Sequence, residues 1–264
     1  MLMAAKNQCK VILLSVKYNI MREMTNRVAF LTNVAFMILN NATFIIQWLL
    51  LFHLKKNIGG YSLHDVMILW GLAAGTYGLS HILFQRAYLL PDLIINGKLD
   101  AFLVQPKNVL LSIISSGTSS SAIGDLIYGY IIVIIFKLSL PNILLFTFLI
   151  ITGGTILTAF AVIAGSICFW IVRGDMIAEN LCNILINFST YPDGIFKGAI
   201  RIILYTIIPI GFAAYIPLHL LLQFNLLYFL AIICFTILIT TIAFLVFYRG
   251  LRRYTSSSLM SSRI

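Results

Sequence analysis

Residues 226–248 read LLYFLAIICFTILITTIAFLVFY and contain no charged side chain. A helix of about 20 apolar residues crosses the hydrocarbon core of a bilayer, so this stretch predicts a membrane span. Similar apolar runs occupy residues 28–52, 66–84, 109–136 and 143–171. The chain of 264 residues is 61% hydrophobic and only 10% charged, which is too few charges for a soluble surface. We therefore expect an all-α integral membrane protein.

The stretch before the last run is harder to interpret. Residues 181–222 are about twice as long as one span, and Pro192, Pro209 and Pro217 interrupt them. One net crossing there gives six transmembrane helices with both termini on one side. The opposite side then holds five of the 18 Lys and Arg residues, Lys55, Lys56, Lys137, Lys197 and Arg201, and the remaining 13 share the side of the termini. The positive-inside rule makes that richer side cytoplasmic, so we predict six spans and a broken or re-entrant segment at 191–222.

This topology divides the chain into three parts. Residues 1–27 carry five basic side chains and no cleavage site, which predicts a cytoplasmic interfacial helix; a disordered tail is the alternative. Residues 28–248 form the transmembrane domain, and residues 249–264 form a basic cytoplasmic tail. We expect a multi-pass protein of the cell membrane. The basic residues lie between apolar runs rather than on a soluble face, so nucleic acid is not an expected partner.

A long cytoplasmic loop at residues 85–108 mixes charged and apolar side chains. Pro91 is placed to begin a helical turn and Gly97 to end it, which predicts one short helix before Gly97 and a second after it. Short amphipathic helices at a cytoplasmic face are candidate docking elements for a partner protein. The alternative is that both helices lie in the lipid interface without a partner.

Polar residues recur inside the first span. Asn26, Asn33, Asn40 and Gln47 are spaced seven residues apart and share one helix face. Amides are costly in lipid, so this face should contact another helix or a second subunit, or lie beside a translocation pathway. Asp125 is the one acid well inside an apolar run. It either handles a proton or an ion, or it is a hydrogen-bonded structural acid.

No motif in the chain supplies energy or catalysis. The sequence has no GxxxxGK[ST] phosphate-binding loop, no HExxH metal motif and no GxSxG hydrolase motif. We therefore predict no catalytic residue, no metal site and no cofactor in this chain. Energy must come from a gradient or from another protein.

Four short stretches give the chain its resemblance to a known family. They are Gly97-Lys98-Leu99-Asp100 with Gln105 and Pro106; Thr190-Tyr191-Pro192; Pro209 with Tyr215-Ile216-Pro217; and Gly250-Leu251-Arg252-Arg253-Tyr254. In this order and topology, the chain resembles the permease subunits of bacterial ABC-2 type exporters.

The resemblance implies a division of labour between subunits. A separate ATPase subunit would bind ATP and Mg²⁺ and dock on the N-terminal helix and the loop. The polar contacts of that coupling element would be Asp92, Asn96, Lys98, Asp100 and Gln105, next to Pro106. A second permease subunit, identical or paralogous, would complete the pathway, and the segment after Tyr191 and Pro192 would form external re-entrant helices above it.

Two other functions compete with an exporter permease. A gradient-driven secondary transporter would use Asp125 and the break at Pro192, although such carriers usually show paired interrupted helices and only one half of this chain is interrupted. A membrane enzyme or assembly scaffold lacks support, because no nucleophile and base occur at a recognisable spacing.

Overall fold

The computed structural model describes residues 2–137 and 139–255. In this part of the chain all regular elements are helical apart from one isolated bridge between Ile58 and Tyr61. The α-helices are α1 (Leu2–Glu23), α2 (Arg27–Leu54), α3 (Leu63–Phe84), α4 (Leu90–Ile95), α5 (Asp100–Leu103), α6 (Val109–Ile114), α7 (Ser121–Lys137), α8 (Leu140–Ser166), α9 (Gly174–Phe188), α10 (Ala199–Thr206), α11 (Ile216–Leu222) and α12 (Leu226–Leu251). Short 3₁₀ turns cover Gln85–Ala87 (η1), Ile167–Phe169 (η2) and Asp193–Ile195 (η3), and a π-helix covers Gly211–Tyr215 (η4).

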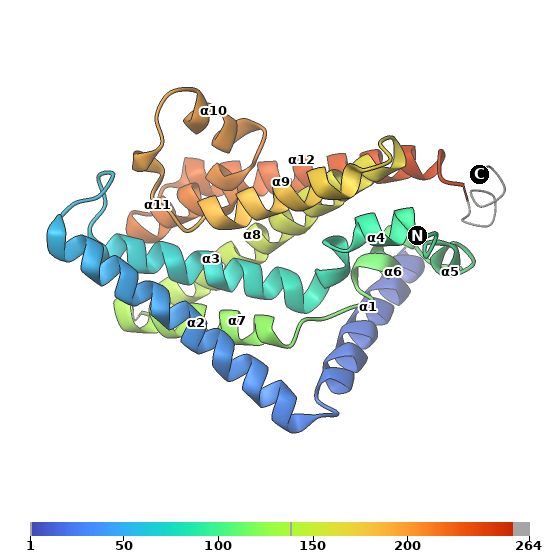
Figure 1. Ribbon diagram of the computed structural model, residues 1–264, viewed down its shortest axis with the longest axis horizontal. Helices are drawn as coiled ribbons and strands as arrows, with labels where there is room; N and C mark the ends of the chain where they lie inside the picture. The colour runs from blue at the N-terminus through green and yellow to red at the C-terminus, as the bar shows by residue number, and fades with distance from the viewer. Residues whose placement is uncertain (1, 138, 256–264) are drawn as a thin grey trace.

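The long helices lie side by side in one bundle with α3 at its centre (Figure 1). Helix α3 packs against α7 and α8, α2 packs against α7, and both α9 and α12 pack against α8. The core therefore forms around α3, where Val66, Leu69 and Leu72 are fully buried. The outer helices α2 and α12 bury few of their residues inside the protein, as expected where lipid or another membrane protein covers them.

Four helical stretches of the described chain are long and apolar enough to cross a membrane. They are Arg27–Leu54, Leu63–Ile95, Leu140–Phe169 and Leu226–Leu251. Helix α10 and the helix Gly211–Leu222 would add a fifth as one broken span, with a bend of 74° between them. The predicted all-α membrane fold is confirmed, and a bent pair of helices precedes the last span. The count of six spans and the re-entrant segment stay predictions.

The helices differ from the apolar runs of the sequence at two places. The apolar run 109–136 is not one helix, because the chain unwinds between α6 and α7. There the hydroxyls of Ser115 and Ser116 bond to backbone carbonyls of α6 at 2.7 Å, and Thr118 bonds to the Ile82 carbonyl at 2.8 Å. These local bonds compete with helical ones. Helix α9 starts at Gly174, earlier than expected, since its first turns carry charged residues that hide it from a hydropathy reading.

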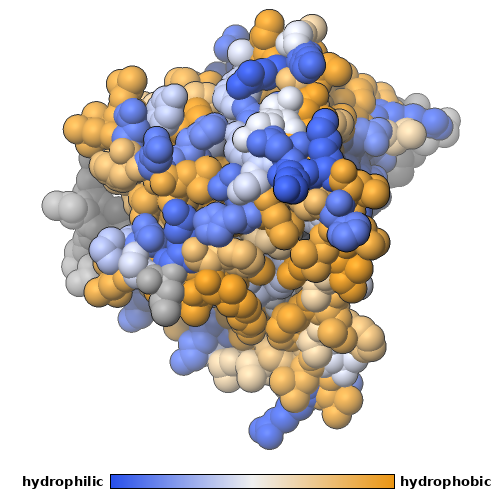
Figure 2. All heavy atoms as spheres, turned by 90° about the vertical axis from the view of Figure 1, so that its left-hand side faces the viewer, coloured by the Kyte–Doolittle hydropathy of each residue, from blue (hydrophilic) through white to orange (hydrophobic). Residues whose placement is uncertain are grey.

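The bundle has two different ends. One end, which we call the α4–α5 end, carries α4, α5, α6 and the start of α1, and α12 terminates there (Figure 1). The other, the α10 end, carries α10, α11 and the connection from α2 to α3. Viewed from the α10 end, hydrophilic residues gather over the centre while hydrophobic atoms cover the flanks (Figure 2). This distribution fits a bundle whose sides face lipid and whose ends face water.

The expected short helices of the 85–108 loop are present. Pro91 lies in the first turn of α4, and Gly97 follows α4 with a φ of +67°, a conformation that glycine adopts without strain. Helix α1 lies across the α4–α5 end and is held by polar contacts to the unwound segment. The Ser15 hydroxyl and the Asn19 amide both donate to the Ser115 carbonyl, at 2.8 and 3.0 Å.

Candidate functional site

A cavity of about 330 Å³ lies inside the bundle between α2, α3, α9 and η4. Its size falls in the range of small-molecule sites, roughly 300–1,000 Å³. Aromatic and polar residues share its lining. The aromatic residues, which we call the aromatic wall, are Phe44, Trp48, Trp70, Tyr77 and Tyr191, and the polar residues include Asn40, Asn41, Gln47, Thr76, Asp125 and Asn187.

Asp125 reaches this cavity from α7 through a contact with α2. The Asn41 amide donates to its Oδ1 at 2.6 Å, and the Asp125 side chain is only 4% exposed. Asn41 is itself buried. The sequence analysis did not include Asn41 in the predicted polar stripe of α2, because this residue falls outside the seven-residue spacing. Its neighbour Asn40 is exposed and lines the cavity.

Several buried polar atoms of the cavity wall have no hydrogen-bond partner in the described protein. They are the Nε1 of Trp70, the Oγ1 of Thr76 and the Oδ2 of Asp125. Buried polar groups are normally paired, and leaving one unpaired costs on the order of 1–3 kcal/mol. A donor, a hydroxyl and a carboxylate oxygen thus lie unpaired and buried in residues that line the same cavity.

A second cavity of about 650 Å³ opens between α3, α4 and α9 at the α4–α5 end. Tyr77 and Ile186 line both cavities, so the two spaces adjoin across these side chains. The rings of Tyr77, His81 and Tyr88 stack at 3.8 and 4.0 Å between centroids along one wall. The two cavities together follow α3 from the α4–α5 end into the bundle.

Helix α9 contributes a polar stripe to this route. Asp175, Glu179, Asn183 and Asn187 follow one another at four-residue spacing and therefore share one helix face. The first three line the second cavity, and Asn187 lines the first. The stripe was missed in the sequence, where a search for helical periodicity over residues 174–188 would have found it.

The predicted coupling residues lie at the surface of the α4–α5 end. Lys98 pairs with the Oδ2 of Asp92 at 2.8 Å, and the Asn96 amide donates to the Oδ1 of the same carboxylate. Gln105 and Pro106 are exposed beyond α5, and Val104 beside them is 84% exposed. Asp92 and Asn96 also line the second cavity, so this loop borders the route directly.

The C-terminal segment packs on the same loop. Tyr254 stacks edge-on against Phe169, with centroids 6.3 Å apart. Burial, and then the nearby Asp100 carboxylate, raise the pKa of the Tyr254 phenol to about 12. Two of the short stretches that carry the family resemblance, around Asp100 and around Tyr254, thus meet in space.

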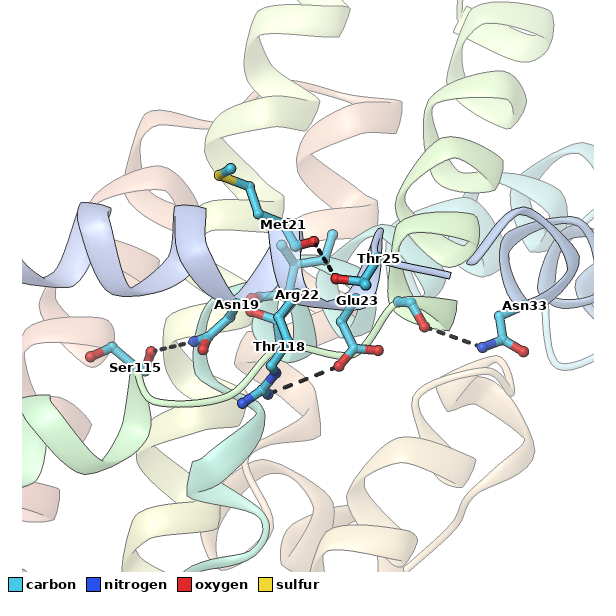
Figure 3. Close-up of polar contacts among 10 residues, drawn as sticks. Asn19, Met21, Arg22, Glu23, Thr25, Asn33, Ser115 and Thr118 are labelled. Carbon is cyan, nitrogen blue, oxygen red and sulfur yellow. Dashed lines mark hydrogen bonds and ion pairs between the residues drawn. The ribbon is translucent and has the colours of Figure 1, made fainter. Parts of the chain in front are cut away.

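Asn33 is separated from the other residues of the predicted α2 stripe. Its amide donates to the Ser120 hydroxyl at 3.3 Å, beside the unwound segment (Figure 3). This residue lines a polar pocket with Arg22, Glu23 and Arg86, whereas Asn40 and Gln47 line the first cavity described above, which we call the central cavity. Figure 3 also shows the Arg22–Glu23 ion pair, 3.9 Å long, at the end of α1.

A buried carboxylate organises the α10 end. Asp193, only 3% exposed, accepts hydrogen bonds from Tyr61 at 2.5 Å, Tyr205 at 2.9 Å and Arg201 at 3.0 Å. Burial and the bond to Asp193 raise the pKa of the Tyr61 phenol. His219 of α11 lies 3.2 Å from the same phenol oxygen. Asp193 therefore ties the α2–α3 connection to α10 and, through Tyr61, to α11.

The predicted proline positions coincide with bends in this region. Pro192 precedes η3, Pro209 lies in the break between α10 and η4, and Pro217 opens α11. Pro217 has no N–H for the carbonyl four residues earlier, and the preceding turns widen into the π-helix. Tyr191, just before these bends, lines the central cavity and packs on Trp48 with centroids 6.0 Å apart.

Comparisons with known proteins identify the family. The family profile described as "ABC-2 family transporter protein" matches residues 38–258, which is most of the chain and includes the lining of both cavities apart from Met37. No curated protein and no solved structure matches the chain. Within the described residues, no group of three His, Cys, Asp or Glu side chains is placed to hold a metal ion. The chain belongs to the ABC-2 transporter family and is a multi-pass membrane permease subunit of the ABC type.

Proposed function

We propose that the chain forms half of the translocation pathway of an ATP-driven exporter and crosses the membrane six times. The single observation that carries this proposal is a route, lined by polar and aromatic residues, that runs from the α4–α5 end into an otherwise apolar bundle: two adjoining cavities that share Tyr77 and Ile186. The six crossings would be α2, α3, α7, α8, α9 and α12, with α10 and α11 as re-entrant helices at an external α10 end.

The basic residues support this orientation. Five are assigned to the outside by the six-span topology. Lys55 and Lys56 lie in the α2–α3 connection, and Lys197 and Arg201 lie at α10. Lys137 ends α7, where the neighbouring Phe136 carbonyl contacts His64 at the start of α3. Helix α1, the 85–108 loop and the end of α12 meet at the opposite end, which the positive-inside rule makes cytoplasmic. Both termini are then cytoplasmic, and the membrane is the cell membrane of a bacterium.

The α4–α5 loop is where an ATPase subunit would dock. Its tip exposes Leu103 and Val104 next to the polar side chains of Asn96, Lys98 and Gln105, which is the mixture of apolar core and polar rim found at protein interfaces. Helix α4 borders the second cavity and packs on α8 and α9. A displacement of α4 by the ATPase would therefore reach the route directly, with ATP and Mg²⁺ bound only by the partner.

A second permease subunit, identical or paralogous, would close the open side of the route. Asn40 and Gln47 are exposed on α2 beside the cavity, and amides facing lipid are costly. A partner helix covering this face would pair these amides and enclose the pathway.

Co-purification with the ATPase subunit tests the proposal. The double variant Lys98→Glu, Asp100→Lys should reduce both ATPase association and ATP turnover, because it reverses two charges at the loop. Lys55→Glu, a reversal at the α10 end, is the control and should leave association unchanged. Equal association of all three proteins would overturn the coupling assignment, and gradient-driven transport by the isolated chain in liposomes without ATP would favour a secondary transporter instead.

A further inference from the structure

The charges along the two cavities are of one sign. Four of the eight acidic residues of the chain line them, Asp92, Asp175 and Glu179 in the second cavity and Asp125 in the first. None of the 18 Lys and Arg residues is among the lining residues of the part that the structure describes. Lys98 offsets Asp92 from outside the cavity, and the described ion pairs include no partner for the other three acids.

This arrangement costs stability. Asp175 and Glu179 are four residues apart on α9, where like charges destabilise a helix by about 0.2–0.5 kcal/mol. Asp125 keeps a buried oxygen without a partner, and an unpaired buried acceptor costs more still. A ligand that supplies positive charge or a donor would relieve both penalties.

The aromatic wall gives the complementary half of the recognition. Trp48, Trp70 and Tyr77 line the cavity that Asp125 borders. The faces of such rings attract cations by about 0.5–2 kcal/mol each and also accept apolar surface. Carboxylates with aromatic faces suit a cation, and they disfavour a phosphate, a sulfonate or a fatty acid.

We infer that the cavities select an amphipathic organic cation, with its positive group at Asp125 and its apolar part against the aromatic wall. The inference rests on the proposed transport function for its biological meaning and names the cargo class of that same site. The acids of α9 attract the cation at the cytoplasmic entrance, and Asp125 with the rings of Trp48 and Trp70 holds it inside the bundle.

Binding to the full-length chain in phosphatidylcholine nanodiscs tests this directly. The probe is a (bromophenyl)butyl-trimethylammonium ion, whose bromine quenches tryptophan fluorescence on contact. Of the three tryptophans, Trp48 and Trp70 line the cavity, so Trp170→Phe provides the background. The comparison ligands are a neutral isostere, with carbon in place of the quaternary nitrogen, and a bromophenyl-butyl sulfonate.

The cation should bind at least tenfold more tightly than either comparison ligand. Asp125→Asn should weaken cation binding about tenfold and leave the neutral isostere unchanged. Glu179→Gln, an exposed position where folding is not at stake, should weaken it about threefold. Glu23→Gln removes the same charge outside both cavities and should have no effect.

Equal affinity for the cation and the neutral isostere, or unchanged cation binding in both Asp125→Asn and Glu179→Gln, overturns the inference. That result is independent of the ATPase experiment. ATP-driven export of a neutral or anionic cargo would refute the proposed cargo class but support the exporter function. Selective cation binding without any ATPase association would support the cargo class but refute the ATP-driven exporter.

Discussion

Replacing Asp193 should loosen the α10 end far more than replacing the arginine that pairs with it. In Asp193→Asn, one carboxylate oxygen becomes an NH₂ group, so a donor then faces Tyr61 or faces Tyr205 and Arg201. The substitution replaces a charged acceptor of three hydrogen bonds with a neutral amide and forces at least one of them to rearrange; because bonds to a charged group contribute more than neutral ones, the cost is about 3 kcal/mol. At 1.4 kcal/mol per tenfold change, local opening becomes about a hundredfold more frequent.

Hydrogen exchange measures this opening, since amide protection reports local stability. The informative amides are those of Ile58 and Tyr61, which donate to each other's backbone carbonyls at 3.1 Å, and that of Phe196, which donates to the backbone carbonyl of Asp193 at 3.0 Å. Mass spectrometry of the chain in nanodiscs should show faster exchange in peptides covering residues 56–62 and 193–206. Peptides from α8 serve as the internal reference and should not change.

Arg201→Gln is the matched control. It also removes one charge from the cluster, but the arginine side chain is 56% exposed, and solvent screens an exposed ion pair so that it contributes little to stability. Exchange in the same peptides should rise less than about fivefold. If Asp193→Asn and Arg201→Gln accelerate exchange equally, or neither does, burial of the carboxylate does not control the stability of this end and the reasoning is refuted.

Two further substitutions test other contacts. Gly194→Ala should lower the thermal stability of the purified chain, because a β-carbon there would overlap the backbone of Gly59. The control, Gly198→Ala, introduces only the strain of a positive φ of 58° and should lower the stability by less. The opposite ranking would contradict the close approach of Gly194 to Gly59. Tyr254→Ala should speed tryptic cleavage at Lys98 and Arg252 by releasing the tail from Phe169 and the α4–α5 loop, whereas Tyr254→Phe keeps the ring contact and should cleave near the wild-type rate.

Length and hydropathy were sufficient to predict the bulk of the fold. A run such as 226–248 has to become a helix in lipid, because only a helix pairs its own backbone groups there. Pro91 and Gly97 bounded α4 correctly, since both act on the local backbone alone. Hydropathy misjudged two elements for physical reasons. The hydroxyls of residues 115–118 bond to backbone carbonyls and interrupt a run that hydropathy counts as one helix, and the acidic residues at the start of α9 lower its hydropathy so that the helix was not recognised there.

The sequence by itself determined that this is an apolar helical membrane protein with two short helices in the 85–108 loop, because those properties follow from composition and from short-range backbone rules. Only the tertiary structure decided which polar residues matter together. Asp125 meets Asn41 across 84 positions of the chain, and Asp193 meets Tyr61 across 132. No periodicity connects residues so far apart; helix packing sets their partners, and it leaves one carboxylate satisfied at the α10 end and the other open toward the cavity.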